Sequence, residues 1–256
     1  RITKSTELIK IHEKDSIKII TSSVTNFCDS LGYCEYKIPF HIEGIKAKPT
    51  LETIQGTRAH IQEEKFEEEH FEFEPITEEQ LSDISTNVEF KREKIFTNLL
   101  IPLQFSDDQV LVSLLGRTDK VFRNNQTLVV QDDKFPNKLE KYADRFEPYP
   151  SQILQALTYL NSLYSDKGYN DPESWFEIPH TEKSWIIQIR DKHNDNKPYK
   201  IFQGMQTREA LEYLHYSIDR FARLVLGIEE FEHHNSAQKC RPCSFAPQCE
   251  FRIDTL

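Results

Sequence analysis

The stretch Gly116–Lys134, GRTDKVFRNNQTLVVQDDK, carries the clearest structural signal in the chain. Two apolar runs flank the Asn-Asn pair at 124–125, and such a pair suits a two-residue type I′ hairpin turn because Asn tolerates a positive φ. A two-residue loop fixes the register and sets Asp119 opposite Val130. The stretch therefore predicts a β-hairpin whose strands carry an unusual number of charges.

The charges of this hairpin divide between its two faces. Side chains alternate along a strand, so Asp119, Asp132 and Lys134 share one face and Asp133 points to the other. Diagonal neighbours lie roughly 7–8 Å apart, near enough for two carboxylates to reach one cation. Because unpaired buried carboxylates are costly, either Lys134 neutralises them in a structural ion pair or a metal ion does. The hairpin alone leaves both interpretations open.

Periodicity and capping signals outline the rest of the chain. The predicted helices are 24–36 capped by Ser22 or Ser23, 51–71 carrying His60, 151–164, and one that Thr207 caps and Gly227 ends. The predicted strands are 89–103, 109–122, 127–134 and 184–190. Helices precede and follow the strand cluster, which indicates a single α/β domain over residues 1–256.

Composition excludes several classes of protein. The 256 residues carry a net charge of −10 and 29% charged residues, with a mean hydropathy of −0.62. No apolar run approaches the ~20 residues of a membrane span, so we expect a cytoplasmic protein without a membrane partner. The acidic balance counts against indiscriminate binding to phosphate backbones.

Nine glutamates and one lysine fall within residues 63–79. A run of like charges of this kind indicates a solvated helix face, with a surface for a protein partner as the alternative.

The five cysteines lie at the two ends of the chain. Nothing in the sequence suggests secretion, so a metal site is favoured over disulfides. The spacing Cys240-x2-Cys243-x5-Cys249 offers three thiolates, and Cys34 offers a fourth. Four thiolates suit a [4Fe–4S] cluster, and they also suit structural zinc.

Two further features complicate the ligand set of this metal. Cys28 is expected to be a buried apolar thiol, with an exchange of roles with Cys34 as the alternative. His233 and His234 lie just before the last three cysteines. They leave a Cys3His zinc site open.

Several motifs, taken together, resemble one family. Thr118-Asp119 followed by Asp132-x-Lys134 resembles the PD-(D/E)XK nuclease signature, and Gly116-Arg-Thr-Asp119 resembles its G-x-x-D form in RecB-like nucleases. Gln155-Ala-Leu-Thr-Tyr159 resembles the QxxxY motif of those enzymes, and Gly56-Thr-Arg-Ala-His60 their G-x-x-x-H helix. Each match alone fits ordinary helix and strand residues. Their joint order, with the cysteines, is similar to iron–sulfur RecB-like nucleases such as CRISPR-associated exonucleases and exonuclease V.

This resemblance implies a fold. It is a restriction-endonuclease-like core, with a central mixed sheet flanked by helices and with the N- and C-terminal segments joined by the metal cluster. The extra length relative to the CRISPR-associated relatives implies an insertion at about 165–206, and the cysteine segment spans 233–256. Asp132 stands where those relatives usually have Glu.

The resemblance also implies an activity. It is a divalent-metal-dependent DNA exonuclease or endonuclease, preferring single strands or ends, in DNA repair or CRISPR adaptation. Lys134 would activate the water, Gln155 and Tyr159 would orient the lysine and the strand, and the [4Fe–4S] cluster would be held by Cys34, Cys240, Cys243 and Cys249. The implied ligands of Mg²⁺ or Mn²⁺ are His60, Asp119, Asp132 and the main-chain carbonyl of Asp133.

The role of the basic residues and the alternative function are not decided by this resemblance. Arg117, Arg123, Lys138, Lys141 and Arg145 are candidates for holding phosphates, although a solvated surface explains most of them equally well. The alternative function is an inactive nucleic-acid- or protein-binding module on the same scaffold with structural zinc.

Overall fold

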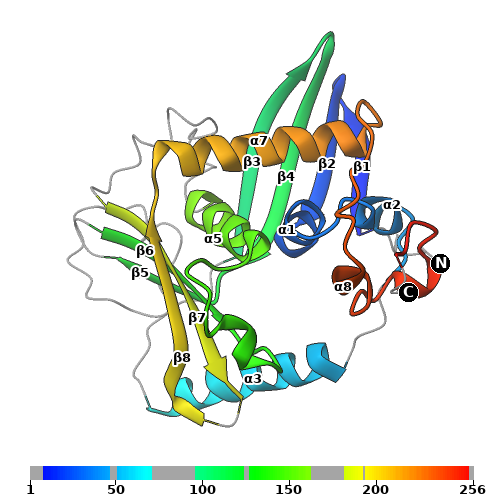
Figure 1. Cartoon of the computed structure of the whole chain (residues 1–256). Helices are drawn as coiled ribbons and strands as arrows, with labels where there is room; N and C mark the ends of the chain where they lie inside the picture. The colour runs from blue at the N-terminus through cyan, green and yellow to red at the C-terminus, as the bar shows by residue number, and fades with distance from the viewer. Residues whose placement is uncertain are drawn as a thin grey trace, which may run out of the picture.

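The computed structural model describes residues 8–46, 51–70, 96–123, 127–162, 182–192 and 194–253. Its strands form two four-stranded sheets (Figure 1). The first has the order β1-β2-β4-β3, with β1 Ile9–Lys14, β2 Ile17–Ser23, β4 Asp108–Arg117 and β3 Phe96–Phe105. The second has the order β5-β6-β7-β8, with β5 Lys120–Arg123, β6 Thr127–Lys134, β7 Glu182–Asp191 and β8 Asn194–Met205.

Helices lie between and around the sheets. They are α1 Val24–Gly32, α2 Lys37–Ile42, α3 Leu51–His70, α5 Pro150–Ser162, α7 Arg208–Val225 and α8 Ala237–Cys240, with 3-10 turns at Leu139–Tyr142 and Ala246–Gln248. Among the described residues, no helix is long and apolar enough to cross a membrane.

Both sheets are mixed, because β2 pairs with β4 and β6 with β7 in parallel while the other pairs are antiparallel. The predicted mixed α/β fold flanked by helices is confirmed. The strand expected over 109–122 is interrupted at Thr118-Asp119, between β4 and β5. This interruption passes the chain from the first sheet to the second, so the described strands form two sheets where one central sheet was predicted.

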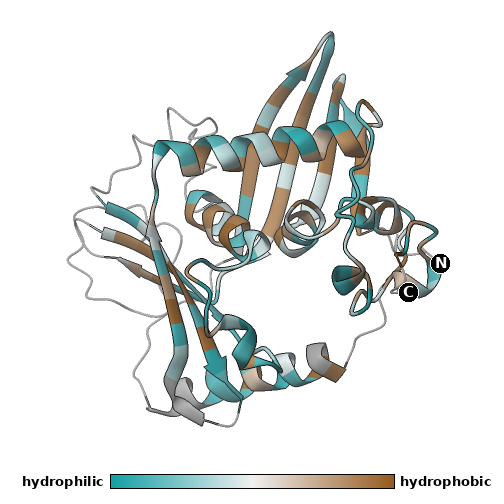
Figure 2. Ribbon diagram, in the orientation of Figure 1, coloured by the Kyte–Doolittle hydropathy of each residue, from teal (hydrophilic) through white to brown (hydrophobic). Residues whose placement is uncertain are grey.

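Helix α5 joins the two sheets. It contacts β3 of the first sheet, β6 and β7 of the second, and helix α1. Its Leu154, Leu157 and Leu160 are buried in the core, as the helical spacing of its apolar residues predicts. Helix α7 contacts α1, α5 and β4, and Figure 2 shows apolar bands along these helices and along the strands beside them.

Capping residues fix the ends of two predicted helices. Ser23 accepts a hydrogen bond from the backbone N–H of Asn26, and Thr207 does the same for Ala210. Both act as N-caps. Gly227 adopts a φ of 68° beyond the end of α7, the left-handed conformation that glycine favours.

Helix α1 ends at Gly32 rather than running through 36 as predicted. A Cβ at Gly32 would lie 2.4 Å from Cα of Ser151, so glycine lets this turn approach the start of α5 closely. The chain leaves the helix here, and Cys34 lies beyond it.

Three strands were not predicted from the sequence, namely β1, β2 and β8. In β1 only Ile9 is buried, since the strand lies at the edge of its sheet and exposes polar residues on both faces. The predicted strand residues 89–95 and the Asn-Asn turn lie outside the described residues.

Candidate active site

The hairpin register differs by two residues from the prediction. Val121 pairs with Val130 and Arg123 with Leu128, so the connection is longer than a two-residue turn. A two-residue shift keeps every side chain on its predicted face. It also moves Asp119 from beside Val130 to beside Asp132, and Asp119 Oδ2 accepts a hydrogen bond from the backbone N–H of Asp133 at 3.1 Å.

One cavity of about 270 Å³ gathers side chains from five parts of the fold. They come from α1, α3, the junction of β4 with β5, β6 and α5. Its lining residues are Thr25, His60, Arg117, Thr118, Asp119, Asp132, Lys134, Gln155 and Tyr159. The structure thus brings together all the predicted side chains of the nuclease site. Thr25 and Thr118 also line the cavity and were not singled out by the sequence.

Lys134 lies at the centre of a hydrogen-bonded chain in this cavity. Its Nζ is 2.6 Å from Oδ2 of Asp132 and donates to Oε1 of Gln155 at 2.8 Å. Nε2 of Gln155 in turn donates to the hydroxyl of Tyr159 at 3.4 Å. Because Gln155 and Tyr159 are one turn apart on α5, the helix holds the lysine from one side while Asp132 holds it from the other.

Asp132 and Lys134 of the cavity shift each other's pKa. Burial, reinforced by the neighbouring Asp119, raises the pKa of Asp132 to about 7, although Lys134 acts in the opposite direction. Burial also opposes the charged form of Lys134, yet Asp132 and Asp119 raise the pKa of the lysine above its usual range. Two carboxylates beside one ammonium, with an imidazole across the cavity, form a donor set that suits a hard divalent cation.

Asp133 belongs to a separate, buried ion-pair network on the other face of β6. Its carboxylate lies 2.7 Å from Lys120 Nζ, and Glu63 of α3 lies 2.8 Å from Arg190 and 3.7 Å from Lys120. Glu63 was predicted to lie on a solvated helix face, and this is wrong for that residue, since it is only 6% exposed. The rest of the acidic run beyond residue 70 lies outside the described residues.

The Glu63 network positions His60. The two residues lie one helical turn apart on α3, so anchoring Glu63 to the second sheet directs the imidazole toward the cavity. The ring of His60 packs edge-on against Phe135, with a centroid distance of 4.7 Å. This anchor was not predicted from the sequence, because its partners Lys120 and Arg190 lie far along the chain.

Gly116 allows Tyr159 to reach the cavity. A Cβ at Gly116 would lie 2.4 Å from Cε1 of Tyr159 and 2.8 Å from Cγ2 of Val24. We therefore expect Gly116→Ala to displace the Tyr159 ring and to lower the free energy of unfolding by about 1–3 kcal/mol, as overpacking does. The melting temperature, measured by thermal denaturation, and the rate of DNA cleavage should both fall.

Gly56→Ala is the matched control for this prediction. The nearest atom to a Cβ at Gly56 is the carbonyl oxygen of Phe135 at 3.8 Å, an ordinary contact, and the residue lies within α3. Alanine should stabilise the helix there by up to about 1 kcal/mol. Equal effects of the two substitutions would contradict the proposed role of the close approach at Gly116.

The predicted basic residues lie in different places. Arg117 lines the active-site cavity, whereas Lys138, Lys141 and Arg145 line a different one. The side chain of Arg123 lies outside the described part of the structure.

Cys28 takes no part in the cysteine site. Its side chain lies in the core and is 2% exposed. It contacts Thr158 and lies near Lys134 and Asp132, and burial raises the pKa of its thiol. The structure therefore places it as the buried thiol that its sequence context predicted.

The other four cysteines converge with two histidines. The Cys34 sulfur and a ring nitrogen of His233 and of His234 all lie within 4.8 Å of one another, and the Cys240 sulfur is 3.9 Å from Nε2 of each histidine. Burial, and then the nearby thiols of Cys243 and Cys249, raise the pKa of Cys34 to about 11, against a hydrogen bond at the Tyr36 backbone. Sulfur and imidazole donors gathered in this way fit zinc or an iron–sulfur cluster.

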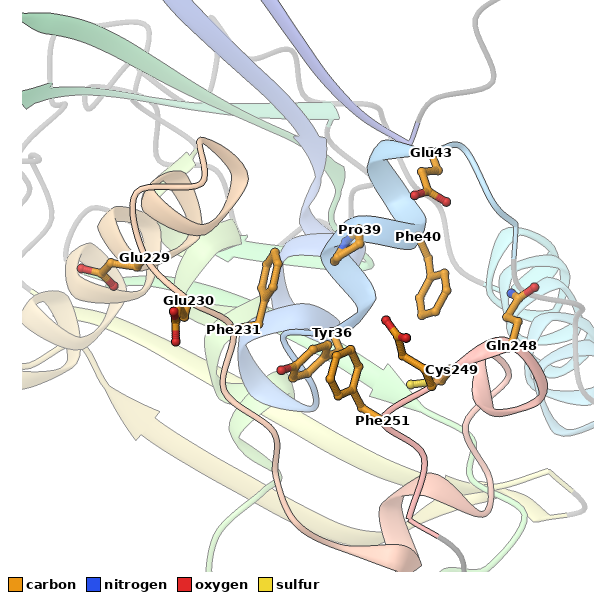
Figure 3. A pocket seen from close by; sticks show the side chains of 11 residues that line it. Tyr36, Pro39, Phe40, Glu43, Glu229, Glu230, Phe231, Gln248, Cys249 and Phe251 are labelled. Atoms are coloured by element: carbon orange, nitrogen blue, oxygen red, sulfur yellow. The ribbon is translucent and has the colours of Figure 1, made fainter.

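Protein contacts hold the cysteine segment against α1 and α2. Arg220 of α7 lies 2.8 Å from Glu35, which also accepts the N–H of Glu232 at 2.7 Å. The rings of Phe40 and Phe245 stack with a centroid distance of 4.9 Å. Figure 3 shows Cys249 among aromatic side chains that line a neighbouring cavity of about 670 Å³.

Three solved structures are similar to the chain. "Crystal structure of SSO0001" matches with a TM-score of 0.50 and 12% identity, covering 94% of this chain and 90% of the other. An alkaline exonuclease from Laribacter hongkongensis matches with a TM-score of 0.39 and 9% identity, covering 81% of this chain and 89% of that one. Its complex with dAMP matches with a TM-score of 0.36 and 12% identity, covering 79% and 92%.

The first of these likenesses reflects the fold alone. Among curated proteins, no sequence matches the chain. The family described as the PD-(D/E)XK nuclease superfamily matches residues 27–250, which include the cavity, its hairpin and the cysteine site. The chain belongs to the PD-(D/E)XK nuclease superfamily.

Proposed function

We propose that the protein is a divalent-metal-dependent DNA exonuclease or endonuclease of RecB-like type, which prefers single strands or ends and acts in DNA repair or CRISPR adaptation. The observation that carries this proposal is the single cavity in which Asp119, Asp132, Lys134 and His60 meet. Membership of a nuclease superfamily supports it, because these are the residue types that phosphodiester hydrolysis requires.

The carboxylates and the imidazole would hold the catalytic ion. Mg²⁺ or Mn²⁺ prefers hard oxygen ligands and keeps several waters, so Asp119, Asp132 and the main-chain carbonyl of Asp133 would bind it, with His60 as a further ligand. The bound ion would supply a nucleophilic water and relieve the charge on the scissile phosphate.

The remaining residues of the cavity would position the attacking water and the DNA strand. Lys134 lies within hydrogen-bonding distance of Asp132 and Gln155, so its ammonium is held in place to position the water and to stabilise the negative charge that develops on the phosphate oxygens. Gln155 and Tyr159 would fix the lysine rotamer through their own hydrogen bond. Tyr159 would also contact the DNA strand.

We further propose that Cys34, Cys240, Cys243 and Cys249 hold a [4Fe–4S] cluster that joins the two ends of the chain. The convergence of these thiols supports it. A second candidate, structural zinc, is supported by the close approach of His233 and His234 to Cys34. We keep the predicted insertion at 165–206 and a protein partner for residues 63–79 as proposals of the same kind.

Cleavage should depend on a divalent ion. A brief treatment with EDTA is expected to abolish cleavage of a labelled single-stranded oligonucleotide, and Mg²⁺ or Mn²⁺ should restore it. His60→Ala should raise the concentration of ion needed for half-maximal rate by at least about tenfold, and more for Mn²⁺, which binds imidazole better than Mg²⁺ does. The metal content of the cysteine site is measured before and after EDTA to show that it is unchanged.

Asp119→Asn protein purified in parallel is the control for contaminating nucleases. Cleavage that survives both this substitution and chelation would remove the assignment of the cavity as a metal-dependent nuclease site.

A further inference from the structure

A second cavity, of about 760 Å³, lies beside the active site. Its walls come from the end of α1, the segment after β6, the first turn of α5 and the cysteine segment. The lining residues are Gly32, Tyr33, Pro136, Lys138, Lys141, Tyr142, Arg145, Tyr149, Pro150, Ser151, Gln152, Ser236, Gln238, Lys239 and Pro242. We call it the basic groove, and its volume is in the range of ligand-binding sites.

The groove concentrates positive charge in an acidic protein. Its charged lining residues are Lys138, Lys141, Arg145 and Lys239, and none of its lining residues is acidic. In the described part of the chain none of the four forms an ion pair with a carboxylate. Arg145 and Lys239 donate to backbone carbonyls and lie over the rings of Tyr149 and Tyr33. Basic residues elsewhere, such as Lys37, do form such pairs. Four unpaired cations in a chain of net charge −10 point to a polyanionic ligand.

The aromatic side chains of the groove are held rigidly. The guanidinium of Arg145 lies 4.0 Å from the ring centroid of Tyr149, and the rings of Tyr149 and Tyr142 pack edge-on at 5.4 Å. Nε2 of Gln152 donates to the hydroxyl of Tyr142 at 3.0 Å. An ordered platform of this kind loses little side-chain entropy when a ligand binds.

Phe146 is the most exposed large apolar side chain described, at 98%. It follows Arg145 of the groove directly in the chain, although it does not itself line the groove. Aromatic side chains next to unpaired cations are the combination that stacks nucleobases and neutralises phosphates of single strands. Bases within a duplex already stack on each other, which leaves no free face for the ring.

The groove lies next to the active-site cavity in the chain, although the two share no lining residue. Pro136 of the groove follows Lys134 of the active site by two residues, and Gln152 of the groove lies one turn before Gln155 on α5. The backbone N–H of Tyr149 donates to Oε1 of Gln152 at 3.1 Å, which caps the start of α5. The positive end of this helix dipole faces the groove and adds to its attraction for phosphate.

We propose that the basic groove binds the single-stranded DNA segment next to the phosphodiester that the active site cleaves. This inference rests on the proposed nuclease function and specifies its substrate. Lys138, Lys141 and Arg145 contact phosphates, and Phe146 stacks on a base.

Binding is measured by fluorescence anisotropy with the full chain carrying Asp119→Asn, so that the probe is not cut. The probe is a labelled mixed-sequence 20-nucleotide DNA strand, and its blunt duplex is the comparison. The triple substitution Lys138→Ala, Lys141→Ala, Arg145→Ala should weaken single-strand binding at least tenfold at low salt. It should also reduce the slope of log affinity against log salt by about 2, because each phosphate contact with a single strand contributes about 0.7.

Phe146→Ala should weaken single-strand binding by at least about fivefold, the lower end of base–aromatic stacking, without changing the salt slope. Duplex binding should change little. The matched controls replace exposed residues that line neither cavity, namely Lys10, Lys14 and Lys46 for the triple and Ile11, 44% exposed, for Phe146. Melting temperatures show that each variant is folded.

The outcomes separate this inference from the proposed function. If the groove variants bind the single strand as the parent does, and the parent chain shows metal-dependent cleavage, the proposal that the groove binds DNA is wrong. The nuclease assignment then stands. Reduced binding in the groove variants of a parent chain that never cleaves supports the groove and removes the nuclease assignment. Tighter binding of the duplex, with no effect of Phe146→Ala, overturns the single-strand inference.

Discussion

Asp132→Asn is expected to reduce DNA cleavage by at least about 10³-fold while the metal-free protein keeps or gains thermal stability. Asp132 is buried, and its pKa is raised to about 7 by burial and by Asp119. The buried carboxylate is therefore crowded by a second one although Lys134 is its ion-pair partner, and asparagine removes that charge. A residue that stabilised the fold through its charge would show the opposite change in stability.

Lys134→Met should separate charge balance from loss of catalysis. It also removes activity, but it takes from the buried Asp132 its ion-pair partner, so the free energy of unfolding should fall by on the order of 2 kcal/mol. Asp119→Ala and Lys134→Ala should each abolish cleavage with the fold retained. The measurements are single-turnover cleavage and denaturant unfolding with and without Mg²⁺.

Mg²⁺ supplies the decisive control for the site. It should raise the melting temperature of the parent chain, because an ion that binds only the folded state stabilises it, and should have little effect on Asp132→Asn. Cleavage retained in Asp119→Ala, Asp132→Asn and Lys134→Ala together would remove the assignment of these residues.

The sequence predicted the face of each hairpin residue but not the partner across the strands. Alternation follows from the period of two in any strand, so Asp119, Asp132 and Lys134 fell on one face and Asp133 on the other. The register depends on the connection, and Asn124-Asn125 indicated a shorter one than the pairing of Arg123 with Leu128 requires. A two-residue error leaves the face unchanged, which is why the predicted group still converges.

Long-range ion pairs were beyond the reach of the sequence. The acidic run containing Glu63 has the composition of a solvated face, and the pairing of Glu63 with Arg190 and Lys120, both far along the chain, accounts for its burial. In the same way, the apolar and polar alternation of β1 extends only from Ile9 to His12, and this edge strand buries Ile9 alone. Caps such as Ser23 and Thr207 were predictable, since their partners lie three residues away.

Cys34→Ala is expected to remove the metal of the cysteine site, whereas Cys28→Ala is expected to retain it. Cys34 lies within reach of His233, His234, Cys243 and Cys249, while Cys28 is buried beside Thr158 on α5. A metal that links residues 34 and 240 closes a very long loop, and a cross-link of that span contributes on the order of 5 kcal/mol in the chain-entropy estimate. Cys34→Ala should therefore also cause a large fall in melting temperature.

Replacing His233 and His234 together identifies the metal of the cysteine site. The chain is purified anaerobically, its visible spectrum is recorded, and iron, zinc and sulfide are measured per chain for the parent, Cys34→Ala, Cys28→Ala and the double substitution His233→Ala, His234→Ala. A [4Fe–4S] cluster held by four thiolates gives a brown protein whose colour survives the histidine substitutions. Zinc held by cysteine and imidazole gives a colourless protein that loses metal when the histidines are replaced.

The possible results distinguish an iron–sulfur cluster from zinc and test the placement of Cys28. Iron lost in Cys34→Ala and kept in Cys28→Ala and the histidine variant supports the iron–sulfur proposal and its ligand set. Zinc lost in both Cys34→Ala and the histidine variant replaces that proposal with a Cys–His site and leaves the PD-(D/E)XK assignment untouched, because the active-site cavity shares no ligand with it. Metal lost only in Cys28→Ala would contradict the placement of that thiol in the core.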